Sequence, residues 1–116
     1  MRTLWMTPIV IALTIVGAVN DAKAAWFTGS DLLQRCESDS IATQNGCTGY
    51  LLAIDDMTKT HDTWGDLSKE FCIPFSVTSI QLEKVVIKGL NEKPELLHLS
   101  ASGLVWHIYK DAFPCD

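Results

Sequence analysis

The chain has 116 residues and a net charge of −5, with 9 basic and 14 acidic side chains. This length supports a single domain once an export signal is set aside. The acidic balance argues against nucleic acid as a partner, because nucleic-acid binding depends on cationic contacts to phosphate. It also disfavours binding to anionic membrane surfaces.

The first 24 residues have the pattern of an export signal peptide. Arg2 supplies the positive start, residues 4–19 carry no charge, and Ala22-Lys23-Ala24 offers small residues at a cleavage site. The apolar run is shorter than the roughly 20 residues that span a bilayer, so an uncleaved signal anchor is the less favoured alternative. We expect cleavage near Ala24 and a mature protein that lies free in the periplasm.

All four cysteines fall in the expected mature domain, residues 25–116. In an oxidising compartment they should form disulfides rather than bind metal or act as nucleophiles. Four cysteines permit three pairings. We favour Cys36–Cys47 with Cys72–Cys115, because each bond would join adjacent helix ends and all four would lie at one end of an antiparallel bundle. A metal site at that end is the alternative, but there is no tight C-x-x-C spacing to support it.

The pattern of apolar residues predicts an all-α fold, a small four-helix bundle stapled by disulfides. Thr28 and Asp31 have capping-box spacing and open the first helix. Residues 38–46 are polar and predict a loop. The second helix should cover residues 47–57, with Asn45 as its N-cap.

Two residues of this second helix need an explanation. Gly49 costs helix stability, which suggests that another helix approaches closely there. Asp55 is expected near the C-terminal end, where a negative charge is unfavourable. We expect Asp55 to accept a hydrogen bond from a nearby backbone or hydroxyl group, and a direct contact with a partner is the alternative.

Residues 58–71 form a long polar connection that contains Trp64, and compact domains seldom keep such a connection without a purpose. Thr78 and Gln81 then have capping-box spacing at the start of a third helix. Pro94 is expected in the first turn of a fourth helix, which runs to about residue 112.

The sequence contains no convincing catalytic set and implies no cofactor. An even number of paired cysteines leaves no thiol for a Cys–His nucleophile, and His61, His98 and His107 lack zinc-ligand spacing. We expect His98 to be a core histidine and His107 to be solvated. Trp106 and Tyr109 should pack in the core, with an interface as the alternative.

Several ordered motifs together resemble a known family. They are FTGSDLLQRCES, CTGYLLAIDD, FCIPFSVTSIQLEKVVIKGLNEKPELLHLSASGLV and AFPC, which span residues 27–115. This set resembles the Rap/Tai family of immunity proteins. The resemblance implies a helical, disulfide-bonded, periplasmic homodimer that inhibits a papain-like peptidoglycan amidase delivered by type VI secretion. Inhibition would occur by occlusion of the enzyme's cleft.

The predicted function is therefore binding and inhibition of an effector, not catalysis. We expect His61, Asp62, Thr63, Trp64 and Asp66 to face the enzyme's cleft, with Trp64 as the buried anchor and an aspartate paired with the catalytic imidazolium. A solvated linker is the alternative for this segment. The alternative for the whole protein is a periplasmic stress chaperone, or another non-enzymatic binding protein with the same fold.

Overall fold

The computed structural model describes residues 26–65 and 67–116. They form the α-helices α1 (Gly29–Cys36), α2 (Ile41–Trp64), α3 (Ser79–Glu92) and α4 (Ala101–Ala112), with a 3₁₀ turn, η1 (Pro94–Leu96), before α4. The expected all-α, four-helix fold is confirmed. The predicted signal peptide and its cleavage site lie outside the described residues.

The predicted caps of two helices are present. The Asp31 amide donates to the Thr28 hydroxyl at 3.2 Å, and the Thr28 amide donates to the Asp31 carboxylate at 2.9 Å. At α3 the Gln81 amide donates to the Thr78 hydroxyl at 3.2 Å, but the Gln81 side chain does not make the reciprocal bond of a capping box. These bonds satisfy amides that have no partner inside the helix, which explains why the chain turns into helix at these positions.

Helix α2 is much longer than predicted, because it begins at Ile41 and continues to Trp64. The prediction of Asn45 as its N-cap is wrong, since Ser40 precedes the first turn and Asn45 lies within the helix. Most of the loop predicted for residues 38–46 is therefore helical.

The three threonine hydroxyls in the second half of α2 are satisfied inside the helix. Thr58, Thr60 and Thr63 each donate to the carbonyl four residues earlier, so the polar run does not need to leave the helix.

Asp55, which was predicted to lie near the C-terminal end of this helix, therefore lies in its interior. Asp55 pairs with Lys59 at 2.6 Å, one turn further along, and not with the backbone or hydroxyl group that we expected. The helix ends instead at Gly65, whose φ of 76° is the left-handed conformation that glycine adopts easily.

Helix α4 begins later than Pro94, the predicted start. Backbone bonds to the chain around the start of α1 hold the segment before α4 out of helix. Leu97 and Leu99 accept from the amides of Ser30 and Gly29 at 2.9 and 3.0 Å, and the Ala101 amide donates to Phe27 at 3.0 Å. The proline therefore opens only the short turn η1.

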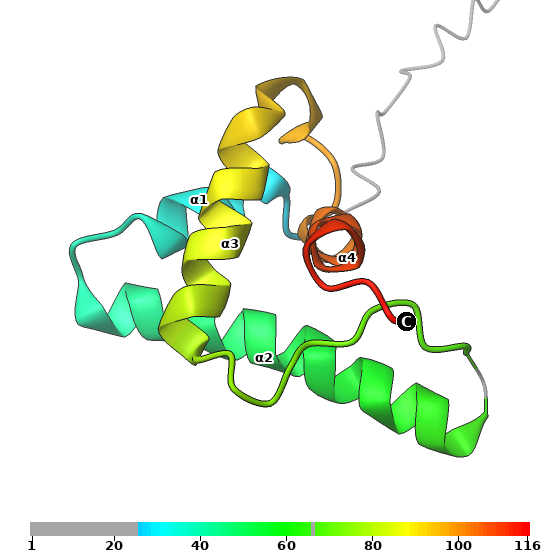
Figure 1. The fold of residues 1–116 in the computed structure, drawn as a ribbon. Helices are drawn as coiled ribbons and strands as arrows, with labels where there is room; N and C mark the ends of the chain where they lie inside the picture. Colours follow the sequence, from blue (N-terminus) through cyan, green and yellow to red (C-terminus); the bar gives the residue numbers. More distant parts are fainter. Residues whose placement is uncertain (1–25, 66) are drawn as a thin grey trace, which may run out of the picture.

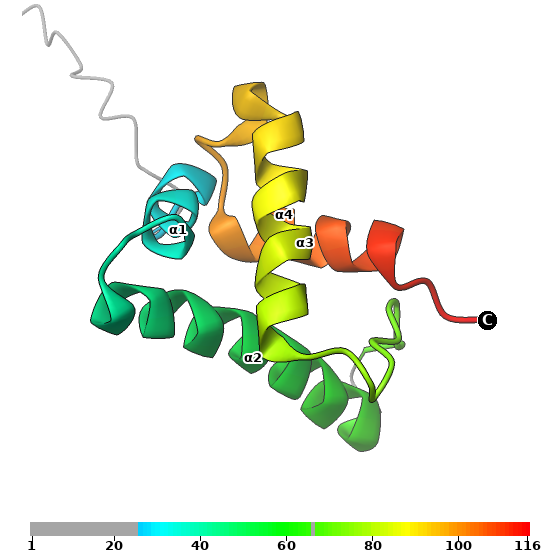
Figure 2. The same ribbon diagram turned by 60° about the vertical axis from the view of Figure 1, so that its left-hand side comes forward.

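Both predicted disulfides are present, Cys36–Cys47 and Cys72–Cys115. The prediction that all four cysteines lie at one end of an antiparallel bundle is wrong. Helix α3 crosses α2, and the α1–α2 connection and the C-terminus lie on opposite sides of the molecule (Figures 1 and 2). One disulfide therefore joins α1 to α2, and the other joins the α2–α3 connection to the C-terminal tail.

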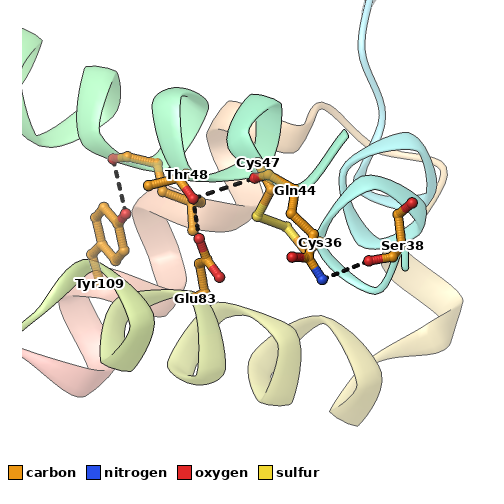
Figure 3. The surroundings of a disulfide bond; sticks show 8 residues. Cys36, Ser38, Gln44, Cys47, Thr48, Glu83 and Tyr109 are labelled. Atoms are coloured by element: carbon orange, nitrogen blue, oxygen red, sulfur yellow. Dashed lines mark hydrogen bonds between the residues drawn. A yellow bond between two sulfur atoms is a disulfide. The ribbon is translucent and has the colours of Figure 1, made fainter. Parts of the chain in front are cut away.

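The core receives residues from all four helices and from the connection before α3. Its buried members are Leu32, Cys36, Cys47, Leu51, Phe71, Leu82, Val86, Leu90, Ala101, Val105 and Tyr109. The Tyr109 hydroxyl donates to the Leu51 carbonyl of α2 at 3.0 Å (Figure 3). Beside Cys47, the Thr48 hydroxyl donates to Glu83 of α3 (Figure 3). These bonds attach α2 to α4 and to α3.

Gly49 does not mark a close helix approach, since a β-carbon there would meet nothing within 4 Å. The close approach is at Gly89 of α3, where a β-carbon would lie 2.7 Å from Cγ1 of Ile108 on α4. Gly89 therefore allows α3 and α4 to pack together.

Alanine substitutions at these two glycines should have opposite effects on stability. Gly49→Ala should stabilise the protein by about 1 kcal/mol, because alanine favours helix and the site is open. Gly89→Ala gains the same propensity but overpacks against Ile108, at a cost of about 1–3 kcal/mol. Urea unfolding should place Gly89→Ala below wild type and Gly49→Ala above it. Equal stabilisation by both would contradict the close packing of α3 on α4.

Tyr109 should make the protein sensitive to alkali. Burial, together with the nearby Asp55 charge, raises the pKa of Tyr109 far above its usual value near 10. Above about pH 10 the unfolded chain loses this proton and the folded protein keeps it, so the free energy of unfolding should fall as pH rises. Below that pH both states hold the proton and the effect vanishes.

Urea unfolding between pH 9 and 11.5 measures this effect. Tyr109→Phe should lower the free energy of unfolding by about 1 kcal/mol at neutral pH, because the hydrogen bond to the Leu51 carbonyl is lost. Its free energy of unfolding should also fall less steeply with rising pH than that of wild type. Part of the decline should remain, because burial also raises the pKa of Tyr50. Parallel pH profiles for the two proteins would exclude Tyr109 as the source.

Candidate functional site

The candidate site is the end of α2 and the segment that follows it. We call this region the α2 tip and define it as residues 61–65 and 67–70. The last turns of α2 extend beyond α3 in both ribbon views (Figures 1 and 2). The α2 tip is therefore presented away from the crossing of these two helices.

Four of the five predicted site residues lie in the last turn of α2, and Asp66 lies outside the described residues. The predicted connection is thus a helix end at this point, not a loop. His61 and Trp64 are three residues apart and share a face of the helix. Asp62 is exposed and Thr63 directs its hydroxyl to the Lys59 carbonyl at 2.8 Å. The helix spreads these side chains around its end instead of gathering them on one side.

Large apolar side chains are exposed at the α2 tip. Trp64 is 72% exposed and Leu67 is 51% exposed. Exposed tryptophan is unusual on a surface that contacts only water, and tryptophan is enriched among residues that dominate protein–protein binding. These two residues make the α2 tip a candidate protein-binding surface.

Three consecutive residues attach the far end of the α2 tip to α4 and the C-terminal tail. Glu70 accepts a hydrogen bond from the Trp106 indole at 2.7 Å. Phe71 is buried and makes edge contacts with the rings of Trp106 and Tyr109. Cys72 forms the disulfide to Cys115. Nothing in the sequence marks Glu70 and Phe71 for these contacts, because their partners lie more than thirty residues away.

Glu70 is also paired with a cation. The Lys110 ammonium lies 3.3 Å from the same carboxylate oxygen that Trp106 contacts. The hydrogen bond from Trp106 lowers the pKa of Glu70, and the Lys110 contact lowers it further. The carboxylate is therefore ionised at neutral pH, as the contact with Lys110 requires.

The histidines do not form a catalytic or metal-binding group. His98 is exposed, contrary to the expected core position, because α4 begins only after it, at Ala101. His107 is exposed, as predicted. In the two described ranges, no three His, Cys, Asp or Glu side chains are placed to hold a metal ion. All four cysteines are in disulfides.

Apolar grooves also lie outside the α2 tip, and two of them run between pairs of packed helices. One, of about 570 Å³, runs between α3 and α4 and includes Gly89 and Ile108. The other, of about 460 Å³, lies between α2 and α4 and includes Met57 and Trp106. Trp106 is half-buried and packs on Phe71, which agrees with the core position expected for it. Within the described part of the chain, no helix is both long and apolar enough to cross a membrane.

Comparison with known proteins identifies the family. The family model for Rap1a immunity proteins matches residues 28–115, which include all four helices and both disulfides. No curated protein sequence matches the chain closely enough to show kinship. The suspected relationship to immunity proteins is confirmed, and a member of such a family acts by binding a secreted effector. The chain belongs to the Rap1a immunity protein family.

Proposed function

We propose that this protein is a periplasmic inhibitor of a peptidoglycan amidase delivered by type VI secretion. The observation that carries the proposal is the family match over residues 28–115. The amidase target comes from the resemblance to Rap/Tai immunity proteins. Export, with residues 1–24 removed as a signal peptide, is supported by the two disulfides, since such bonds persist in oxidising compartments.

The α2 tip is the surface that we assign to inhibition. Trp64 would enter an apolar subsite of the enzyme's cleft, and Asp62 or Asp66 would pair with the imidazolium of a catalytic Cys–His pair. The exposure of Trp64 and Leu67 supports this assignment. Occlusion needs no reactive group on the inhibitor, so the absence of a free thiol is no obstacle to it.

The proposal includes a homodimer, as the family resemblance implies. The apolar groove between α2 and α4, with the exposed Met57 at its edge, is compatible with burial against a second copy. Light scattering on the mature, oxidised protein should give twice the monomer mass. A monomer at micromolar concentration would remove this part of the proposal and leave the inhibition untouched.

A pull-down tests the function. The mature, oxidised protein should serve as bait in an extract of the producing cells, and bound proteins should be identified by mass spectrometry. We expect one tight partner with a papain-like amidase domain, whose hydrolysis of purified peptidoglycan is blocked at a one-to-one ratio. A mixture of unfolded envelope proteins would favour the chaperone alternative, and a bound amidase that stays active would refute inhibition.

A further inference from the structure

Glu70 occupies a distinctive place at the boundary of the α2 tip. It accepts from Trp106 at 2.7 Å and from Lys110 at 3.3 Å through one carboxylate oxygen. Trp106 and Lys110 are four residues apart on α4, so both donors lie on one face of that helix. The contact joins parts of the chain that are 36 residues apart.

The residues on either side of Glu70 differ sharply in their surroundings. Leu67, Ser68 and Lys69 before it are exposed. Phe71 after it is buried at 1% exposure, and the Cys72 amide donates to the Phe113 carbonyl at 2.8 Å. Among the described residues that follow α2, Glu70 is therefore the first that is attached to α4.

We propose that Glu70 is a positioning residue that fixes the exposed segment 67–69 of the α2 tip against α4 in the conformation that binds the effector. This inference rests on the proposed function of the α2 tip. At the other end, Gly65 closes α2 in a left-handed cap. Restrained at Glu70, the segment has fewer conformations to lose when it binds, so less conformational freedom is lost on association.

The effect of Glu70 should be local. Exposed ion pairs contribute little to global stability, and Phe71 and the Cys72–Cys115 disulfide hold the following residues without Glu70. Loss of Glu70 should therefore release the segment before Phe71 while the helices stay folded.

Hydrogen exchange tests the positioning without any effector. In Glu70→Ala, the Trp106 indole N–H should exchange about tenfold faster or more, as expected when one charge-assisted hydrogen bond is lost. The NMR order parameters of residues 67–69 should fall in the same variant. The melting temperature should stay close to that of wild type. Glu70→Gln keeps an oxygen that accepts from Trp106 and should restore most of the protection. The matched control is Glu92→Ala, which removes an exposed carboxylate paired with Lys88 on α3 and should leave these sites unchanged.

Binding of the captured effector then tests the consequence. Glu70→Ala should bind it several-fold more weakly, with Glu70→Gln between the variant and wild type. Unchanged exchange in Glu70→Ala would overturn the positioning role, and so would faster exchange with unchanged affinity. Faster exchange with no effector bound even by wild type would refute the proposed function instead, and the role of Glu70 would then be confined to ordering this segment.

Discussion

Replacing Trp64 with alanine should weaken inhibition of the effector about 30-fold or more and leave the melting temperature unchanged. The side chain is 72% exposed, so the folded protein loses little packing when it is removed. If the tryptophan is buried in the enzyme's cleft, its truncation should cost about 2 kcal/mol or more of binding free energy, as for other aromatic hot spots. The measurement is the inhibition constant in a peptidoglycan hydrolysis assay.

Phe75→Ala is the matched control for this variant. Phe75 is a fully exposed aromatic residue in the connection between α2 and α3, and it lies beyond the attachment at Cys72. Its removal should change the inhibition constant by less than a factor of three. Equal losses in both variants would indicate a broad interface, and an unchanged constant in Trp64→Ala would exclude Trp64 as the anchor.

Removal of the Cys72–Cys115 disulfide should have the largest effect on stability. This bond closes a loop with a sequence separation of 43, whereas Cys36–Cys47 closes one of 11. Through the lost entropy of the unfolded chain, the first bond should stabilise the fold by about 4 kcal/mol and the second by about 3 kcal/mol. A small domain has little stability to spare, so either loss is severe.

The comparison uses the double variants Cys72→Ala/Cys115→Ala and Cys36→Ala/Cys47→Ala, which leave no unpaired thiol. Urea unfolding followed by circular dichroism should rank the first variant as the less stable. The reverse order would mean that the buried pair Cys36–Cys47, which lies in the core, contributes more through packing than the longer loop contributes through chain entropy.

Local signals in the sequence predicted the parts of the fold that depend on neighbouring residues. Thr28 and Thr78 cap their helices as expected, because a cap is decided within four residues. The disulfide pairing was also correct, although the antiparallel arrangement used to argue it was not. Each bond still joins segments that the helices bring together.

Two kinds of bond that composition does not reveal, one within a helix and one between distant segments, account for what the sequence did not predict. The length of α2 depends on hydroxyl groups that bond within the helix and on Gly65, whereas composition alone made residues 58–71 resemble a loop. The late start of α4 depends on backbone bonds to Phe27, Gly29 and Ser30. His98 is exposed for the same reason.

At the candidate site, too, the sequence indicated one residue and gave no sign of another. The sequence identified Trp64 as an exposed aromatic residue, and the structure places it on the surface at the end of α2. It did not indicate Glu70, because nothing near that residue in the chain marks its contact with Trp106 and Lys110.

Hydrogen exchange of the mature protein with and without its captured effector shows whether the effector covers the α2 tip. Binding should slow exchange at residues 61–70, the end of α2 and the segment after it, and should leave exchange in the groove between α3 and α4 unchanged. Protection confined to the α3–α4 groove, with none at residues 61–70, would contradict the assignment of the α2 tip as the inhibitory surface.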